Sequence, residues 1–200
     1  YSQTYLKTIN NQITTIFNHA VKLYGLQSNP CHKVGSMGKK KAKEMKFYTK
    51  DEFKLFINQL MDKRLSYVCF MVMYWTGIRV GELLALDVGD VDVKHKTISI
   101  TKSYQRLEGE DVVTLQKTDA SNRVIDIPDY LDEDLKDYLD YLYMPEPTDR
   151  LFTGSKYYLR RKLARGAKQA GIKKIRILGR RRVAWSQGRR RGGVVGWRWV

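Results

Sequence analysis

Apolar residues recur at three- and four-residue steps in several stretches of the chain, which is the spacing of an amphipathic helix. This pattern predicts a helix over residues 4–24, whose apolar positions are Leu6, Ile9, Ile13, Ile16, Phe17, Ala20, Val21 and Tyr24. It also predicts helices over 49–61, 129–142 and 155–170. Residues 65–75 are apolar nearly all round, so we expect that helix at the centre of the core.

The apolar period changes to two in the middle of the chain. Residues 97–101 read Thr-Ile-Ser-Ile-Thr, the alternation of a half-buried strand. Two more strands are predicted at 112–115 and 123–127, with turns at 108–110 and 118–122. Three short strands with tight loops predict an antiparallel meander. With the helices, they indicate an α+β fold that is mainly α.

A charged pair, Arg79 and Glu82, follows the most apolar run and Gly77. Charged side chains are rarely buried without a partner, and two residues three apart on a helix can pair. One interpretation is therefore a structural ion pair in a short helix that ends near Leu86. The other is an arginine held by the core and directed at a phosphate, because a guanidinium donates to two oxygens at once. The residues alone leave both interpretations open.

The net charge of +16 indicates a polyanionic partner, most simply nucleic acid. The charge is unevenly placed along the chain. Residues 1–149 hold 20 Lys and Arg against 21 Asp and Glu, a net charge of −1. Residues 150–200 hold 17 Lys and Arg and no acidic residue. All of the excess positive charge therefore belongs to the C-terminal quarter.

Residues 29–46 are predicted to form a linker, because Pro30, Gly35 and Gly38 interrupt the helical pattern. The linker ends in a basic run made of Lys39, Lys40, Lys41 and Lys43. This run is either a solvated segment or a basic strap along a nucleic-acid backbone. The helix before it cannot bury its own apolar stripe, so it must pack on another part of the protein. Tyr1 is not a start residue, so we expect the chain to begin inside a longer protein.

The two cysteines, Cys31 and Cys69, have neither the spacing of a disulfide framework nor that of a zinc site. We expect Cys69 to be a buried apolar residue, and a reducing cytoplasm fits this cysteine content. No apolar run reaches the roughly 18 residues of a membrane helix. No signal peptide opens the sequence. A membrane partner is therefore not expected.

Two motifs resemble those of the tyrosine recombinases, the phage-integrase family. The string TGIRVGELLAL, from Thr76 to Leu86, resembles the first arginine box of that family. The string QKTDASNR, from Gln116 to Arg123, resembles its β-hairpin lysine motif. Together with the order of the predicted elements, the resemblance covers residues 49–177. It implies the catalytic-domain fold of that family, with a three-stranded antiparallel sheet.

The resemblance also implies how the chain is divided. Residues 1–28 would be the last helix of a core-binding domain, and 29–46 a linker that passes along the DNA. Residues 47–177 would be an incomplete catalytic domain. Residues 178–200 are rich in Arg and Gly and do not fit the family pattern.

The same resemblance implies a reaction without metal or cofactor on double-stranded DNA. A tyrosine hydroxyl attacks a backbone phosphate and forms a 3′-phosphotyrosyl link. Arg79 would clamp that phosphate with Glu82 in support, and Lys117 would protonate the departing 5′-oxygen. The residues expected to contact DNA are Lys39, Lys40, Lys41, Lys43, Arg123, Arg160, Arg161 and Arg165.

The sequence departs from the family after residue 177. Leu178 stands where the family has the histidine of a His-x-x-Arg box, and Arg181 occupies the register of the second arginine. Tyr158 is the last tyrosine and precedes the region where the nucleophile belongs. The segment 178–200 is explained by a reading-frame change, by a cloning or sequencing error, or by a natural basic arm, and the frame change explains its composition best.

Three functions are compatible with these features. The first is a site-specific recombinase of a phage or mobile element that lacks its nucleophile here and still binds DNA. The second is a non-catalytic DNA-binding module on the same fold. The third is an unrelated basic protein that binds nucleic acid. The first two place Arg79 and Lys117 on one surface, and the third does not. The family implies a tetramer on DNA for the parent protein, and we expect this fragment to be a monomer.

Overall fold

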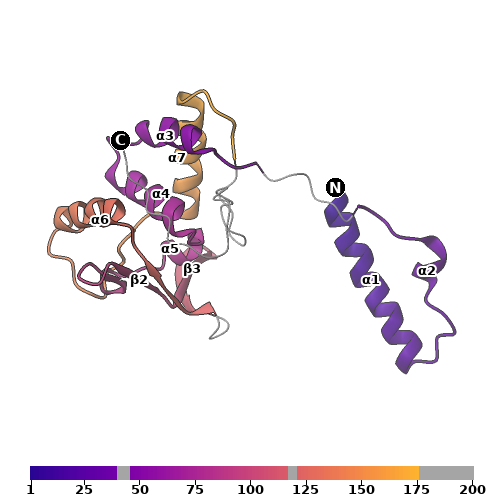
Figure 1. Cartoon of the computed structure of the whole chain (residues 1–200). Coiled ribbons are helices and arrows are strands. Elements are labelled where there is room, and N and C mark those ends of the chain that lie inside the picture. Colours follow the sequence, from indigo (N-terminus) through magenta and orange to yellow (C-terminus); the bar gives the residue numbers. More distant parts are fainter. Residues whose placement is uncertain (40–45, 117–120, 176–200) are drawn as a thin grey trace, which may run out of the picture. The chain divides into compact units, whose positions relative to one another are not determined.

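The computed structural model describes residues 1–39, 46–116 and 121–175 (Figure 1). The chain divides into two compact units, an N-terminal unit, Tyr1–Met45, and a C-terminal unit, Lys46–Val200. Each unit is described by itself.

The N-terminal unit is a helical hairpin rather than a single helix followed by a linker. Helix α1, Gln3–Leu23, agrees with the prediction, and a short helix α2, Pro30–Val34, packs against it. The buried Asn29 joins the two, because its side-chain amide donates to the Thr14 carbonyl at 3.0 Å and to the Asn18 side chain at 2.7 Å.

The predicted linker over 29–46 is therefore wrong for its first part. The Met37 backbone N–H donates to the Asn10 side chain at 3.2 Å, and the Lys39 N–H donates to the Gln3 carbonyl at 3.2 Å. At Gly38 a Cβ would lie 2.3 Å from that carbonyl, so only glycine allows this approach. Residues 40–43, with Lys40, Lys41 and Lys43, lie outside the described residues.

The C-terminal unit is mainly helical, as predicted. Its helices are α3 (Lys50–Asn58), α4 (Arg64–Thr76), α5 (Val80–Leu83), α6 (Asp129–Tyr141) and α7 (Lys156–Gln169). The start of α3 has the expected capping box, in which Thr49 and Glu52 each accept the other's backbone N–H. The predicted short helix to Leu86 is shorter in the structure and ends at Leu83.

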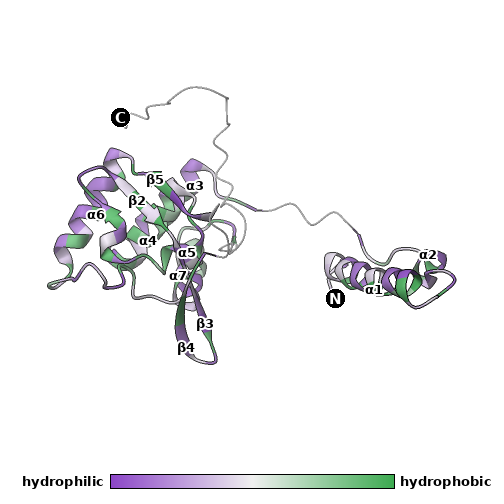
Figure 2. Ribbon diagram, turned by 90° about the horizontal axis from the view of Figure 1, so that it is seen from below, coloured by the Kyte–Doolittle hydropathy of each residue, from purple (hydrophilic) through white to green (hydrophobic). Residues whose placement is uncertain are grey.

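Helix α4 forms the centre of the core (Figure 2). Seven of its residues are buried, and Cys69 and Val72 have no exposed surface. Helices α3, α5 and α6 pack against it. The prediction of a buried Cys69 is thus confirmed, and burial raises the pKa of its thiol.

The strands pair differently from the predicted meander. Strands β1 (Val91–Asp92), β2 (Thr97–Ile100) and β5 (Arg123–Asp126) form one antiparallel sheet in the order β1-β2-β5. Strands β3 (Lys102–Leu107) and β4 (Glu110–Leu115) form a separate hairpin. The predicted strand over 112–115 therefore pairs with β3 and not with β2.

The hairpin of β3 and β4 projects from the rest of the unit (Figure 2). Its turn places Glu108 and Gly109 at positive φ angles of 51° and 93°, as a tight hairpin turn requires. Strand β3 escaped prediction because Tyr104 is its only buried position, so its sequence shows no apolar alternation.

Asp134, on the side of α6 that faces α4, provides a first prediction. Burial raises the pKa of its carboxyl to about 6, although the Tyr67 hydroxyl donates to it at 3.4 Å. Since this pKa is higher in the folded than in the unfolded chain, the folded protein loses stability as the pH rises through 6. We expect Asp134→Asn to raise the free energy of unfolding by about 1–2 kcal/mol at pH 7.

Urea denaturation at pH 7 and pH 4 checks this expectation. The gain should nearly vanish at pH 4, where Asp134 is protonated in the folded protein. Asp126→Asn, at an exposed position, serves as the matched control and should change little at either pH. An equal gain in the free energy of unfolding at both pH values, or a loss at pH 7, would show that the ionised Asp134 carboxylate does not destabilise the folded protein.

Candidate functional site

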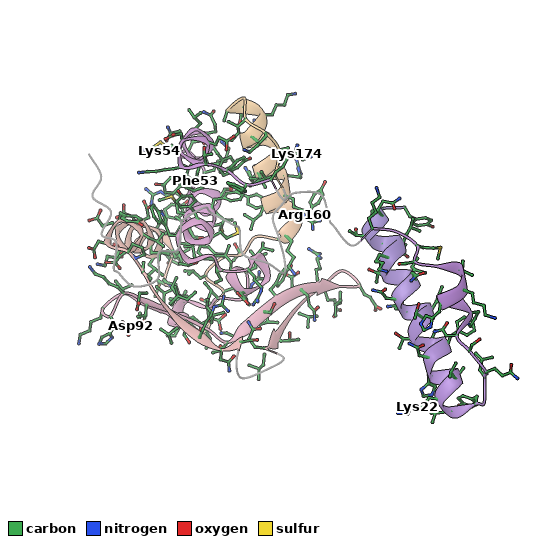
Figure 3. All side chains as sticks on the ribbon, turned by 45° about the vertical axis from the view of Figure 1, so that its right-hand side comes forward. Lys22, Phe53, Lys54, Asp92, Arg160 and Lys174 are labelled. Atoms are coloured by element: carbon green, nitrogen blue, oxygen red, sulfur yellow. The ribbon has the colours of Figure 1, made fainter. Side chains whose placement is uncertain are left out.

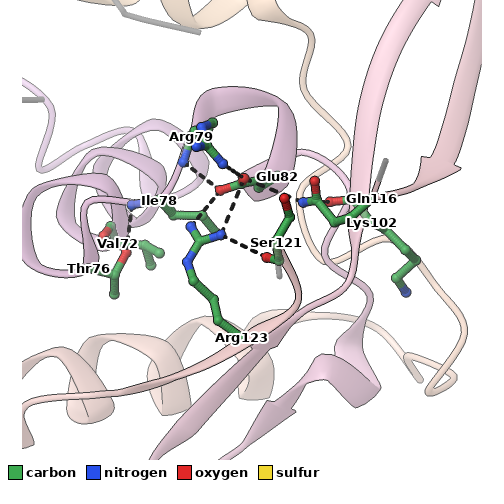
Figure 4. Close-up of polar contacts among 9 residues, drawn as sticks. All are labelled: Val72, Thr76, Ile78, Arg79, Glu82, Lys102, Gln116, Ser121 and Arg123. Atoms are coloured by element: carbon green, nitrogen blue, oxygen red, sulfur yellow. Dashed lines mark hydrogen bonds and ion pairs between the residues drawn. The ribbon is translucent and has the colours of Figure 1, made fainter. Parts of the chain in front are cut away.

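A buried carboxylate, that of Glu82, lies at the centre of a polar cluster (Figure 4). Only 2% of this residue is exposed. Its oxygens accept the Arg79 backbone N–H at 3.0 Å and the Arg79 guanidinium through Nη1. They also accept Arg123 Nη2 at 2.7 Å and, more weakly, Gln116 Nε2 at 3.4 Å. The Arg79–Glu82 pair expected from their spacing is therefore present.

The local sequence sets the position of Arg79. Gly77 ends α4 in the left-handed conformation, with φ of 64°. The Thr76 hydroxyl donates to the Val72 carbonyl at 2.6 Å and accepts the Ile78 N–H at 3.3 Å, which satisfies backbone groups at the break. Arg79 is then extended and precedes α5, so its side chain leaves a packed corner of the core.

The cluster carries a surplus of positive charge. Burial opposes ionisation of Glu82, but hydrogen bonds from Arg123 and Arg79 outweigh it and hold the pKa of Glu82 below its usual range. One carboxylate therefore faces two guanidinium groups. The Arg79 side chain is 44% exposed and the Arg123 side chain 33% exposed, so this surplus is open to a ligand from solvent.

Lys117 lies outside the described residues, but the described residues on either side of 117–120, Gln116 and Ser121, both contact the cluster. Gln116, at the end of β4, donates to Glu82 as given above. Ser121, at the other end, accepts Arg123 Nη1 on its carbonyl at 3.3 Å. The chain thus enters and leaves residues 117–120 beside the carboxylate that holds Arg79. Arg181 also lies outside the described residues.

Helix α7 presents a row of basic side chains beside this corner. Arg160, Arg161 and Arg165 are exposed, and Arg160 lies on the outer side of the helix (Figure 3). At the start of α7, Lys156 Nζ lies 3.4 Å from where a Cβ on Gly81 of α5 would be. Burial, with Arg160 nearby, lowers the pKa of Lys156. Lys39 is exposed too, but it belongs to the N-terminal unit.

Two contacts of the site were missed by sequence reasoning. The sequence predicted only a DNA contact for Arg123 and gave no sign that its guanidinium binds Glu82, 41 positions away in the sequence. Arg150 was not singled out, yet it joins the hairpin to α5 and α7 through Asp111 and several carbonyls. No spacing rule connects residues so far apart.

In residues 1–39, 46–116 and 121–175, no three or more His, Cys, Asp or Glu side chains are placed to hold a metal ion. Among the same residues, no helix is long and apolar enough to cross a membrane.

The sequence model of the phage integrase family matches residues 46–184, more than half of the chain. The chain belongs to the phage integrase family. The match includes both motifs, and it continues past residue 177, where the catalytic domain was predicted to end. The α+β fold is shared with solved structures of a transposon integrase and a recombinase.

This chain is similar to several known proteins. The ICEBs1 integrase of Bacillus subtilis strain 168 is 38% identical over 125 residues, which cover 60% of this chain and 34% of that protein. The solved structure of the Tn1549 transposon integrase with circular intermediate DNA has a TM-score of 0.67 at 18% identity, over 82% of this chain and 58% of that one. The XerA recombinase has a TM-score of 0.51 at 26% identity, over 66% and 46%. The chain thus spans about a third of its curated relative.

Proposed function

We propose that this integrase chain binds double-stranded DNA and that Arg79 contacts a backbone phosphate of it. The observation that carries the proposal is the partly exposed Arg79 guanidinium, anchored on a buried and ionised Glu82. Because the single Glu82 carboxylate faces two partly exposed guanidinium groups, the site keeps positive charge that a phosphate can neutralise. The Tn1549 integrase structure, which contains DNA, supports this partner.

The parent reaction we propose is strand cleavage and rejoining through a 3′-phosphotyrosyl link, for a phage or mobile element. In that reaction Arg79 and Arg181 would neutralise the charge that grows on the phosphate, and Lys117 would donate a proton to the leaving 5′-oxygen. The contacts of Gln116 and Ser121, which flank residues 117–120, with the Glu82 cluster support the role of Lys117.

The 200-residue polypeptide itself is proposed to bind DNA without cutting it. Its last tyrosine is Tyr158, whose hydroxyl pairs with Ser66 Oγ at 2.8 Å in the part-buried interior. That hydroxyl is hydrogen-bonded to Ser66 and not to a residue of the Arg79 cluster. A non-catalytic DNA-binding module on the same fold is therefore the second candidate function, and for this polypeptide alone both candidates predict the same behaviour.

Binding to a duplex at several salt concentrations tests the proposal. We expect affinity to fall steeply with salt, because phosphate contacts release counterions. Replacing Arg160, Arg161 and Arg165 together by serine should weaken binding at least tenfold and flatten the salt dependence by about two to three units. No protein–DNA adduct should survive detergent after incubation with supercoiled or nicked plasmid.

The matched control removes three exposed charges elsewhere in the same unit, with Lys50, Lys54 and Lys94 changed to serine. It should weaken binding much less than the α7 variant does. Equal losses in the two triple variants would mean that α7 is not the DNA surface. A detergent-resistant adduct would show that the polypeptide has a nucleophile and would refute its inactivity.

A further inference from the structure

We propose that Arg123 is a positioning residue. Its guanidinium compensates the negative charge of Glu82 and so leaves Arg79 available to a DNA phosphate. The inference rests on the proposed function, because it needs Arg79 to bind DNA. It assigns to Arg123 a task different from direct contact with DNA.

The geometry distinguishes the two arginines. Arg123 reaches both oxygens of Glu82, with Nη2 2.7 Å from Oε2 and Nη1 3.3 Å from Oε1. The side chain of Arg79 reaches only Oε1, through Nη1, while its backbone N–H bonds to Oε2. Arg123 therefore holds the carboxylate on two points, and Arg79 can release its side chain while its backbone stays bound.

The backbone elements that hold the two arginines also favour release of Arg79 rather than Arg123. Arg123 belongs to β5, where it pairs with Ile100 of β2, and its Nη1 is also bound to the Ser121 carbonyl. Arg79 precedes a helix of a single turn and is the more exposed of the two. Of the two guanidinium groups, the one on the sheet is thus the better fixed, and the one at the helix start is the better placed to leave.

The charge balance explains why two arginines are needed. Glu82 is 2% exposed, and an ionised carboxylate without a counterion is very costly at such a position. If Arg79 were its only cation, moving that guanidinium to a phosphate would leave Glu82 uncompensated. With Arg123 in place, the same movement leaves a neutral pair behind. Gln116 cannot replace Arg123 in this task, because its amide carries no charge.

A mutant cycle in DNA affinity tests the inference. We expect Arg79→Met to weaken duplex binding about tenfold, the loss of one charge-assisted contact. Arg123→Met should weaken it by a similar factor, because Arg79 is then retained by Glu82. The double variant Arg79→Met/Arg123→Met should be no weaker than either single variant, since both changes remove the same contact.

Replacing Glu82 by glutamine separates a positioning role of Arg123 from a purely structural one. Only a positioning role makes the effect of Arg123→Met on DNA affinity depend on the charge of Glu82. In Glu82→Gln protein, Arg79 is no longer retained by a charge, so adding Arg123→Met should change DNA affinity less than twofold. This comparison also holds if Arg123→Met alone does not fold, because the Glu82→Gln change leaves no buried charge at that position. A tenfold loss on adding Arg123→Met to Glu82→Gln, or additive losses in the first cycle, would mean that Arg123 contacts DNA itself and would overturn the inference.

The outcomes separate this inference from the proposed function. If the unaltered protein does not bind duplex DNA, or if Arg79→Met binds as well as it does, the role of Arg79 fails. If Arg79→Met weakens binding and Arg123→Met does not, only the role of Arg123 fails. Thermal unfolding of each variant confirms that the folded protein is being compared.

Discussion

Replacing Arg150 by alanine is expected to lower the free energy of unfolding by about 3 kcal/mol. Its side chain is 24% exposed and pairs with Asp111 at 2.9 Å, while its guanidinium lies 4.6 Å from the centre of the Tyr104 ring. It also donates to three backbone carbonyls, those of Leu84, Phe152 and Gly154. Alanine would remove the ion pair and the ring contact and leave these carbonyls without that donor.

Chemical denaturation of Arg150→Ala measures the effect, and Arg106→Ala is a matched control. Arg106 also approaches Asp111, at 3.8 Å, but it is 59% exposed, so its loss should cost less than about 0.5 kcal/mol. Arg150→Lys should recover only part of the stability, because an ammonium cannot donate in all of these directions. Equal effects at Arg106 and Arg150 would contradict a joining role for Arg150.

This prediction bears on the site because Arg150 fixes the hairpin that leads to Gln116. Asp111 and Tyr104 lie on opposite strands of the hairpin and are joined at 2.7 Å. Leu84 directly follows α5, and Gly154 directly precedes the cap of α7. Weakening the hairpin would therefore displace Gln116 from Glu82 as well as lower the overall stability.

Local patterns were enough to predict α1, α3, α4, α5, α6 and α7 and the Arg79–Glu82 pair, but they missed the short helix α2. Apolar residues at three- and four-residue steps predicted α1 and α7, and the spacing of Arg79 and Glu82 predicted their pair. Both patterns depend only on residues within one or two turns of a helix. The end of α4 was also predictable, since Gly77 is a residue that adopts the left-handed conformation readily.

Non-local pairing was not predictable in the same way. Strand partners depend on which segments meet in the folded chain, so nothing in residues 112–115 shows that they pair with β3 rather than β2. Likewise, Asn29 gave no sign that it would satisfy backbone groups of α1 and hold residues 29–39 against that helix. The Arg123–Glu82 contact also depends on β5 and α5 meeting, and the motif alone could not identify it.

The second large effect concerns the meeting of Arg79 and Lys117. We propose that both lie at one phosphate-binding site, and Lys117 is outside the described residues. With Cys31→Ser and Cys69→Ala as background, Arg79→Cys/Lys117→Cys should react nearly completely with a short bismaleimide crosslinker. The reference pair is Arg79→Cys/Ser121→Cys, because the Ser121 carbonyl touches the same cluster. Neither pair should react efficiently in concentrated urea, where the fold no longer brings the positions together.

Peptide mass analysis of the crosslinked chain is the most direct test of whether Arg79 and Lys117 lie close together on one surface. We expect a 79–117 crosslink in the native protein, formed about as fast as the 79–121 reference. A native protein that forms the 79–121 crosslink and no 79–117 crosslink would contradict it.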